Sequence, residues 1–418
     1  GARPVGRVVG RCRASLRELR VAFQRTGGDG ALSDAELWHG LGGCARLEAL
    51  HLSGMRTSGR TCQGLTAVLT SCAETLRDLR IGTCVAAAML LPTSALAVDG
   101  ADGTPAADAD DLRPSPEVQR LIAVGSSLNL RRLALNGLTI EADVPARPRA
   151  LQLNAAALLH GVALIAPALA ELDLSGNADL LACALPPWGD WTTGHGALLA
   201  VVGACQPLAV LDLTGSRLSL ADLSGLLGRH STALKELRLA GSSIDFEASP
   251  PHLNLPLREF AAALTACDQL EHLELGDVGY IRAMHRPVLT MLQRCSPTLR
   301  CLRGILPWSI VENGLSSLFK SGTCREGGAR RLEVLALGGA VPRQLESTSG
   351  IAQVLAANAG TLRSVSLSGA ALDDGSCLAL VRALRPAPLE RLVLENCGVA
   401  ANTIKYLAAA LRVCGPAG

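Results

Sequence analysis

Aromatic side chains are scarce in this chain of 418 residues. Phenylalanine, tryptophan and tyrosine together make up 2% of it, although 49% of the residues are hydrophobic. A core therefore has to be built from alanine and leucine, which suits thin stacked layers.

Motifs of catalysis and metal binding are also missing. The sequence contains no G-x-S-x-G, no H-E-x-x-H, no phosphate-binding loop and no dinucleotide-binding fingerprint. Fourteen cysteines are present, but none forms C-x-x-C, and no cysteine–histidine cluster has zinc spacing. We therefore expect no enzymatic activity, no catalytic residue, no metal site and no cofactor.

Neither strong charge nor a long apolar run is present. The formal net charge is +2, which predicts neither nucleic-acid nor membrane binding. The longest apolar runs fall below the ~18 residues that a spanning helix requires. We expect no nucleic-acid partner and no membrane insertion.

What the sequence does have is a recurring leucine pattern, clearest at Leu208, Leu211, Leu213 and Gly215. Side chains alternate faces along a strand, so Leu211 and Leu213 point the same way. The glycine two places later allows a sharp turn. Apolar residues at helical spacing follow over 219–229. One unit is thus strand, turn and helix, and it has to stack on copies of itself to bury its apolar face.

The pattern recurs twelve times, mostly at intervals of 26 to 39 residues, with one interval of 54 after Leu76. In the weakest copy Gly304 stands where the third leucine is expected. Helices are expected before each next triad, among them 33–42, 63–73, 219–229, 256–266, 285–294, 347–358 and 374–384. The first leucines of the twelve copies are Leu16, Leu47, Leu76, Leu130, Leu169, Leu208, Leu234, Leu270, Leu299, Leu332, Leu362 and Leu389.

These repeats resemble the leucine-rich repeat family, in its ribonuclease-inhibitor-like or cysteine-containing long-repeat branch. The resemblance implies an α/β fold, a leucine-rich repeat solenoid with a parallel inner sheet and about twelve repeats. Connections between parallel strands are almost always right-handed, which predicts a right-handed βα superhelix. The family's buried Asn or Cys after the triad is matched at Asn177, Cys84 and Cys397, with Ser216 and Ser242 as polar substitutes. Elsewhere the position is apolar, so we expect an irregular solenoid.

The expected organisation is a lead-in or cap over 1–15 and one repeat domain over 16–414, interrupted by insertions at 86–115 and 178–193. The first insertion is acidic and rich in Pro and Gly, which favours a loop. The second contains Trp188 and Trp191. These indoles are candidates for partner contacts, or else they pack over a neighbouring repeat.

Five cysteines share one slot, three or four residues before a first leucine, where a small and weakly polar side chain packs well. Successive slots lie on different layers, so we expect buried thiols rather than disulfides and an intracellular, reducing compartment. Cytoplasm or a ciliary or cytoskeletal setting is favoured, with the mitochondrion as the alternative because the first 25 residues are rich in arginine. The five are Cys44, Cys72, Cys205, Cys267 and Cys295.

The residue between the last two leucines of each triad should project from the concave face. This row begins basic, becomes acidic and ends in small neutral residues, which suits a protein partner of complementary charge or reflects ordinary solvation. The candidate partner-binding residues on this face are Arg20, His51, Arg80, Asp173, Asp212, Arg238, Glu274 and Arg303.

These observations predict a non-enzymatic scaffold or adaptor, a subunit of a large intracellular assembly whose partners are other proteins. A ciliary, cytoskeletal or organellar complex is the expected setting. Two alternatives stay open: a GTPase-activating regulator of a small GTPase, which would need a dedicated arginine or asparagine, and a substrate receptor of a ubiquitin ligase, which would need an adaptor-binding module before the repeats.

Overall fold

The chain divides into two compact units, Gly1–Leu218 and Ser219–Gly418, here called unit 1 and unit 2. The structure, a computed structural model, describes residues 9–22, 35–54, 59–82, 129–137, 168–177, 205, 208–245, 255–276, 285–305, 331–344, 349–399 and 405. Both insertions, 86–115 and 178–193, fall outside the described residues. The single repeat domain over 16–414 stays a prediction.

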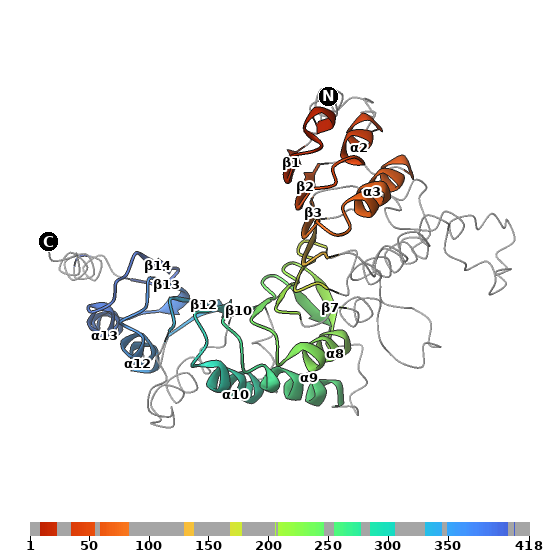
Figure 1. Ribbon diagram of the computed structural model, residues 1–418. Helices are drawn as coiled ribbons and strands as arrows, with labels where there is room; N and C mark the ends of the chain where they lie inside the picture. The colour runs from red at the N-terminus through yellow and green to blue at the C-terminus, as the bar shows by residue number, and fades with distance from the viewer. Residues whose placement is uncertain are drawn as a thin grey trace, which may run out of the picture. The chain divides into compact units, whose positions relative to one another are not determined.

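The described part of unit 1 contains six parallel strands whose order in the sheet follows the sequence. They are β1 (Glu18–Ala22), β2 (Ala49–Ser53), β3 (Asp78–Gly82), β4 (Arg132–Asn136), β5 (Glu171–Asp173) and β6 (Val210–Asp212). Helices α2 (Ala35–Leu41) and α3 (Gly59–Ser71) both lie on the same side of β1–β3 (Figure 1).

Unit 2 repeats this arrangement over its described residues. Its parallel strands are β8 (Glu236–Arg238), β10 (His272–Leu275), β11 (Cys301–Ile305), β12 (Val334–Gln344), β13 (Ser364–Ala371) and β14 (Arg391–Glu395). Its helices are α8 (Leu220–His230), α9 (Leu255–Ala266), α10 (His285–Cys295), α12 (Ser349–Ala357) and α13 (Asp374–Leu384). Two further short strands are β7 (Arg217–Ser219), at the unit boundary, and β9 (Ser243–Asp245).

The leucine triads form the core layers, as the sequence predicted. Leu208, Leu211 and Leu213 are all 1% exposed or less, and the triad leucines of the other interior repeats are 6% exposed or less. Removing a leucine side chain from water stabilises by roughly 1.5–3 kcal/mol. In the first and last described strands the layer is thinner, and Leu19 and Leu392 are only half-buried.

Glycine explains the turn after several of the strands. Gly215 has φ +67°, in the left-handed region that favours glycine, and this allows the sharp turn that follows the triad. Gly304, which replaces the third leucine of its triad, has no room for a side chain. A Cβ there would lie 2.8 Å from the Leu275 carbonyl oxygen.

The fold is therefore an α/β solenoid of leucine-rich repeats, and the predicted fold class is confirmed. The described helices lie within four residues of their expected bounds; α13, for example, spans Asp374–Leu384 as expected. Register is conserved from strand to strand over the triad positions, so equivalent positions of neighbouring repeats lie side by side there. This register creates the candidate site.

Candidate functional site

The predicted contact residues lie in one row within each unit, on the sheet face opposite the triad leucines. We call this the strand face. In unit 1 the register aligns Arg20 with His51, His51 with Arg80, and Asp173 with Asp212. In unit 2 it aligns Arg238 with Glu274 and Glu274 with Arg303. Trp188 and Trp191 lie outside the described residues, so their role stays a prediction.

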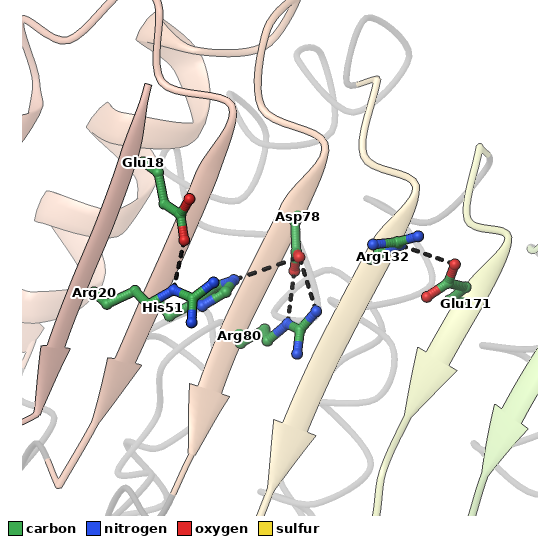
Figure 2. Close-up of polar contacts among 7 residues, drawn as sticks. All are labelled: Glu18, Arg20, His51, Asp78, Arg80, Arg132 and Glu171. Carbon is green, nitrogen blue, oxygen red and sulfur yellow. Dashed lines mark hydrogen bonds and ion pairs between the residues drawn. The ribbon is translucent and has the colours of Figure 1, made fainter. Parts of the chain in front are cut away.

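Arginines on the strand face of unit 1 are each held by a carboxylate (Figure 2). Arg20 Nε donates to Glu18 on the same strand. Arg80 binds Asp78 through two hydrogen bonds of 3.0 Å each, from Nε to Oδ1 and from Nη2 to Oδ2. A carboxylate so engaged fixes the direction in which the guanidinium points.

Arg132 is oriented from the next strand, because its Nε lies 2.8 Å from Oε1 of Glu171 on β5. The side chains of Arg20, Arg80 and Arg132 nevertheless remain 71%, 50% and 53% exposed. They are held in place but open to a partner, and exposed pairs of this kind contribute little to stability.

His51 and Asp78 lie deeper between these arginines. His51 Nε2 is 3.4 Å from Asp78 Oδ2, and the two side chains are 16% and 15% exposed. Burial of Asp78 opposes its ionisation, but the hydrogen bonds and charge of Arg80, with the charge of His51, outweigh it. The pKa of Asp78 therefore lies below its ordinary value of 3.8.

The two aspartates at the acidic end of the unit 1 row bind their own turns. Asp173 Oδ1 accepts from the Ser175 N–H at 2.9 Å, and Oδ2 accepts from the Asn136 amide at 2.8 Å. Asp212, 8% exposed, accepts from the Thr214 N–H at 3.0 Å. Their carboxylates stabilise the strand ends, whereas the side chains of the arginines on this face stay half-exposed or more.

A second row of charges, not singled out from the sequence, runs beside the first. It consists of the residue directly after the first leucine of each repeat, and we call it the leading row. Backbone hydrogen bonds join successive members of this row: Glu48 N–H donates to Arg17 O at 2.7 Å, and Arg77 N–H donates to Glu48 O at 2.8 Å. Ten of the twelve members are charged, and this signal is visible when the repeats are aligned. The twelve members are Arg17, Glu48, Arg77, Arg131, Ala170, Ala209, Lys235, Glu271, Arg300, Glu333, Arg363 and Glu390.

The leading row of unit 2 alternates in sign at every step. Ion pairs join Lys235 to Glu271 at 3.3 Å, and Glu271 to Arg300 at 3.8 Å. Arg300 also lies 3.7 Å from Glu333. Farther along, Arg363 lies 2.9 Å from Glu390. This row neutralises itself.

Threonines directly before the first leucine, which were not singled out from the sequence, tie neighbouring repeats together. Thr75 Oγ1 donates to Leu47 O at 3.0 Å, and Thr298 Oγ1 donates to Leu270 O at 2.8 Å. Thr361 makes the equivalent bond to Leu332 O at 2.8 Å. Each hydroxyl satisfies a carbonyl of the preceding repeat.

Two of the expected polar side chains after the triads, Asn177 and Cys397, hydrogen-bond to backbone carbonyls and so stabilise the repeats. The Asn177 amide donates to the carbonyls of Leu135 in the preceding repeat and of Leu174. Cys397 Sγ donates to Leu367 O, 30 residues earlier, at 3.3 Å. Cys84 lies outside the described residues.

The five slot cysteines are all buried, at 1% exposure or less, and are free thiols. Burial raises the pKa of Cys205, Cys267 and Cys295 to about 12. Thiols with such a pKa stay protonated and unreactive near neutral pH. Cys72 Sγ donates to Cys44 O at 2.8 Å, so the slot also links repeats.

Within the described ranges, no three His, Cys, Asp or Glu side chains gather closely enough to hold a metal ion. No helix in the same part of the chain is both long and apolar enough to cross a bilayer.

Comparison with known proteins finds no matching family model and no matching curated protein. Among solved structures, the leucine-rich repeat-containing protein LegL7 from Legionella pneumophila matches 96% of this chain and 98% of its own, at 11% identity and a TM-score of 0.35. Yeast Rad7, solved in complex with Elc1, matches 98% of this chain and 80% of its own, at 14% identity and a TM-score of 0.42. At these scores neither likeness bears on function, and the fold rests on the leucine layers themselves.

Proposed function

We propose that this leucine-rich repeat solenoid is a non-enzymatic scaffold that binds other proteins through its strand face. The observation that carries the proposal is the set of exposed arginines on β1–β4, each oriented by a carboxylate and none buried in the core. Oriented, half-exposed charges set the specificity and rate of protein association.

The finer setting is also a proposal. A subunit of a ciliary, cytoskeletal or organellar assembly in a reducing intracellular compartment suits a chain with these buried free thiols. The slot cysteines likewise support assignment to the cysteine-containing long-repeat branch. The two alternatives, GTPase activation and ubiquitin-ligase substrate reception, gain no supporting observation from the described residues.

Photo-cross-linking in cells tests the proposal. A photoreactive amino acid replaces Ala134, which lies on the strand face between Arg80 and Asp173 in the register. The control carries the same amino acid at Leu378 on α13, a 46% exposed position on the helical side. We expect discrete protein adducts from position 134 in excess of those from position 378. No excess at position 134 would overturn the proposal.

A further inference from the structure

One pair of neighbouring strands concentrates positive charge. Strands β3 and β4, with their leading-row residues, carry four arginines, Arg77, Arg80, Arg131 and Arg132, and only one carboxylate of their own, Asp78. The local formal charge is therefore +3. We call these four arginines the arginine patch; the backbones of the two neighbouring strands that carry them lie about 4.8 Å apart.

Two members of the patch are like charges placed side by side. The Arg131 N–H donates to Arg77 O at 2.9 Å, so these leading-row residues are direct neighbours, and both are exposed. Neither forms an ion pair with another described residue. Like charges on adjacent strands destabilise a sheet, so the fold itself gains nothing from this arrangement.

The next two strands carry the opposite charge. On β5 and β6, Glu171, Asp173 and Asp212 give a local formal charge of −3. Asp173 and Asp212 are bound to turn groups but keep their charge. A uniform polyanion laid over the patch would meet these carboxylates within one or two strand spacings, about 5–10 Å. The charge pattern therefore disfavours a nucleic acid or an anionic membrane.

We infer that the arginine patch receives a carboxylate-rich segment of a partner protein. The inference rests on the proposed scaffold function and names the chemistry of the partner. A protein segment, unlike a polyanion, can place acidic side chains over β3–β4 and neutral or basic ones over β5–β6. Guanidinium groups bind carboxylates through two parallel hydrogen bonds, which gives geometric as well as electrostatic selectivity.

The test measures binding of a fluorescently labelled ten-residue peptide of alternating glutamate and serine to the full chain, by fluorescence anisotropy at low salt. A lysine–serine peptide and single-stranded oligouridine of matched length are the comparison probes. We expect the glutamate peptide to bind best and its affinity to fall as salt is added. Tighter binding of oligouridine, or equal binding of the two peptides, would overturn the inference.

Charge reversal assigns the binding to the patch. The double variant Arg77→Glu/Arg131→Glu should weaken binding of the glutamate peptide by about tenfold or more, because it turns attraction into repulsion. Arg258→Glu/Arg286→Glu, at exposed positions on α9 and α10, makes the same change in total charge and should leave binding within about twofold. Equal losses in the two double variants would contradict the assignment. If the charge-reversed variant does not fold, the milder double variant Arg77→Gln/Arg131→Gln replaces it, and we expect a smaller loss of affinity for the glutamate peptide.

The cross-linking experiment separates the two proposals. If the Arg77→Glu/Arg131→Glu chain still gives the same adducts from position 134, the scaffold function stands and the patch assignment fails. If the original chain gives no excess of adducts at position 134, the function fails as well.

Discussion

The two units share one repeat architecture but order the charges of their leading rows differently. In unit 2 the row alternates in sign from Lys235 to Glu390, and four ion pairs along it join atoms 2.9 to 3.8 Å apart. In unit 1 it alternates from Arg17 to Arg77, then places Arg131 beside Arg77 and ends in two alanines.

This difference separates two uses of the same position. An alternating row satisfies its own charges and needs no other molecule. A row with adjacent like charges pays a small energetic penalty that a partner of opposite charge would remove. The comparison of the units indicates how a surface available for binding can be identified. The charges that the fold leaves uncompensated are a better guide than the number of charges on the surface.

The largest expected effect concerns what the units have in common. Leu79→Asp in unit 1 and Leu273→Asp in unit 2 each bury an unpaired carboxylate in a leucine layer, since both leucines are 1% exposed. Each should lower the free energy of unfolding by about 4 kcal/mol or more. Chemical denaturation measures the loss, with Leu378→Asp, at an exposed position, as the control. A loss under about 1 kcal/mol in either buried variant would contradict the layer description.

A smaller effect, again equal in both units, is expected from the threonines that link repeats. Thr75→Val and Thr298→Val each leave a carbonyl of the preceding repeat without its hydroxyl donor. Each should cost about 1 kcal/mol. Thr290→Val is the control, because Thr290 bonds only within its own helix, to Arg286 O. A control as costly as Thr298→Val would show that the link between repeats is not what matters.

The sharpest test of the comparison applies one substitution to both leading rows. Arg300→Glu places a third carboxylate between Glu271 and Glu333 and should destabilise by roughly 0.5–1 kcal/mol. Arg131→Glu instead sets an opposite charge beside Arg77 and should be neutral or stabilise by a few tenths of a kcal/mol. Thermal unfolding of both variants measures the signs. If Arg300→Glu and Arg131→Glu shift stability in the same direction by the same amount, the leading rows of the two units do not differ in how their charges are compensated.

The smallest effect concerns the charge of Asp78 in unit 1, which interacts with both Arg80 and His51. The pKa of Asp78 is lowered in the folded chain, so its stabilising contribution is complete above the ordinary pKa of 3.8 and is lost as pH falls through the lower folded value. Asp78→Asn should therefore be less stable than the original chain at pH 7. The gap should close below pH 3.8. A gap that stays constant across this range would assign the loss to packing instead of charge.

Much of the fold was predictable from residues alone, because a buried leucine has to recur wherever a layer recurs. The spacing of Leu208, Leu211 and Leu213 predicted a strand, and Gly215 predicted the turn that the left-handed φ confirms. Burial of the slot cysteines followed from their fixed place before each first leucine. The missing leucine at Gly304 was visible too, but its cause, contact with the Leu275 carbonyl, was not.

The candidate site was less predictable, because alternation gives only the face on which a side chain lies. Asp173 and Asp212 were grouped with Arg20 as partner contacts, yet their carboxylates bind turn N–H groups that no spacing rule predicts. The leading row and the threonines carried a signal that becomes visible only when the repeats are aligned residue by residue.

The sequence by itself determined the layers, since hydrophobic periodicity acts locally and every repeat must bury the same three positions. Only the tertiary structure decided which charges neutralise one another. Residues such as Lys235 and Glu271 lie 36 positions apart in the chain, and parallel pairing brings their side chains to 3.3 Å. Coulomb energy depends on that distance in space, so the charges left uncompensated, Arg77 and Arg131 among them, emerge only when neighbouring repeats are in register.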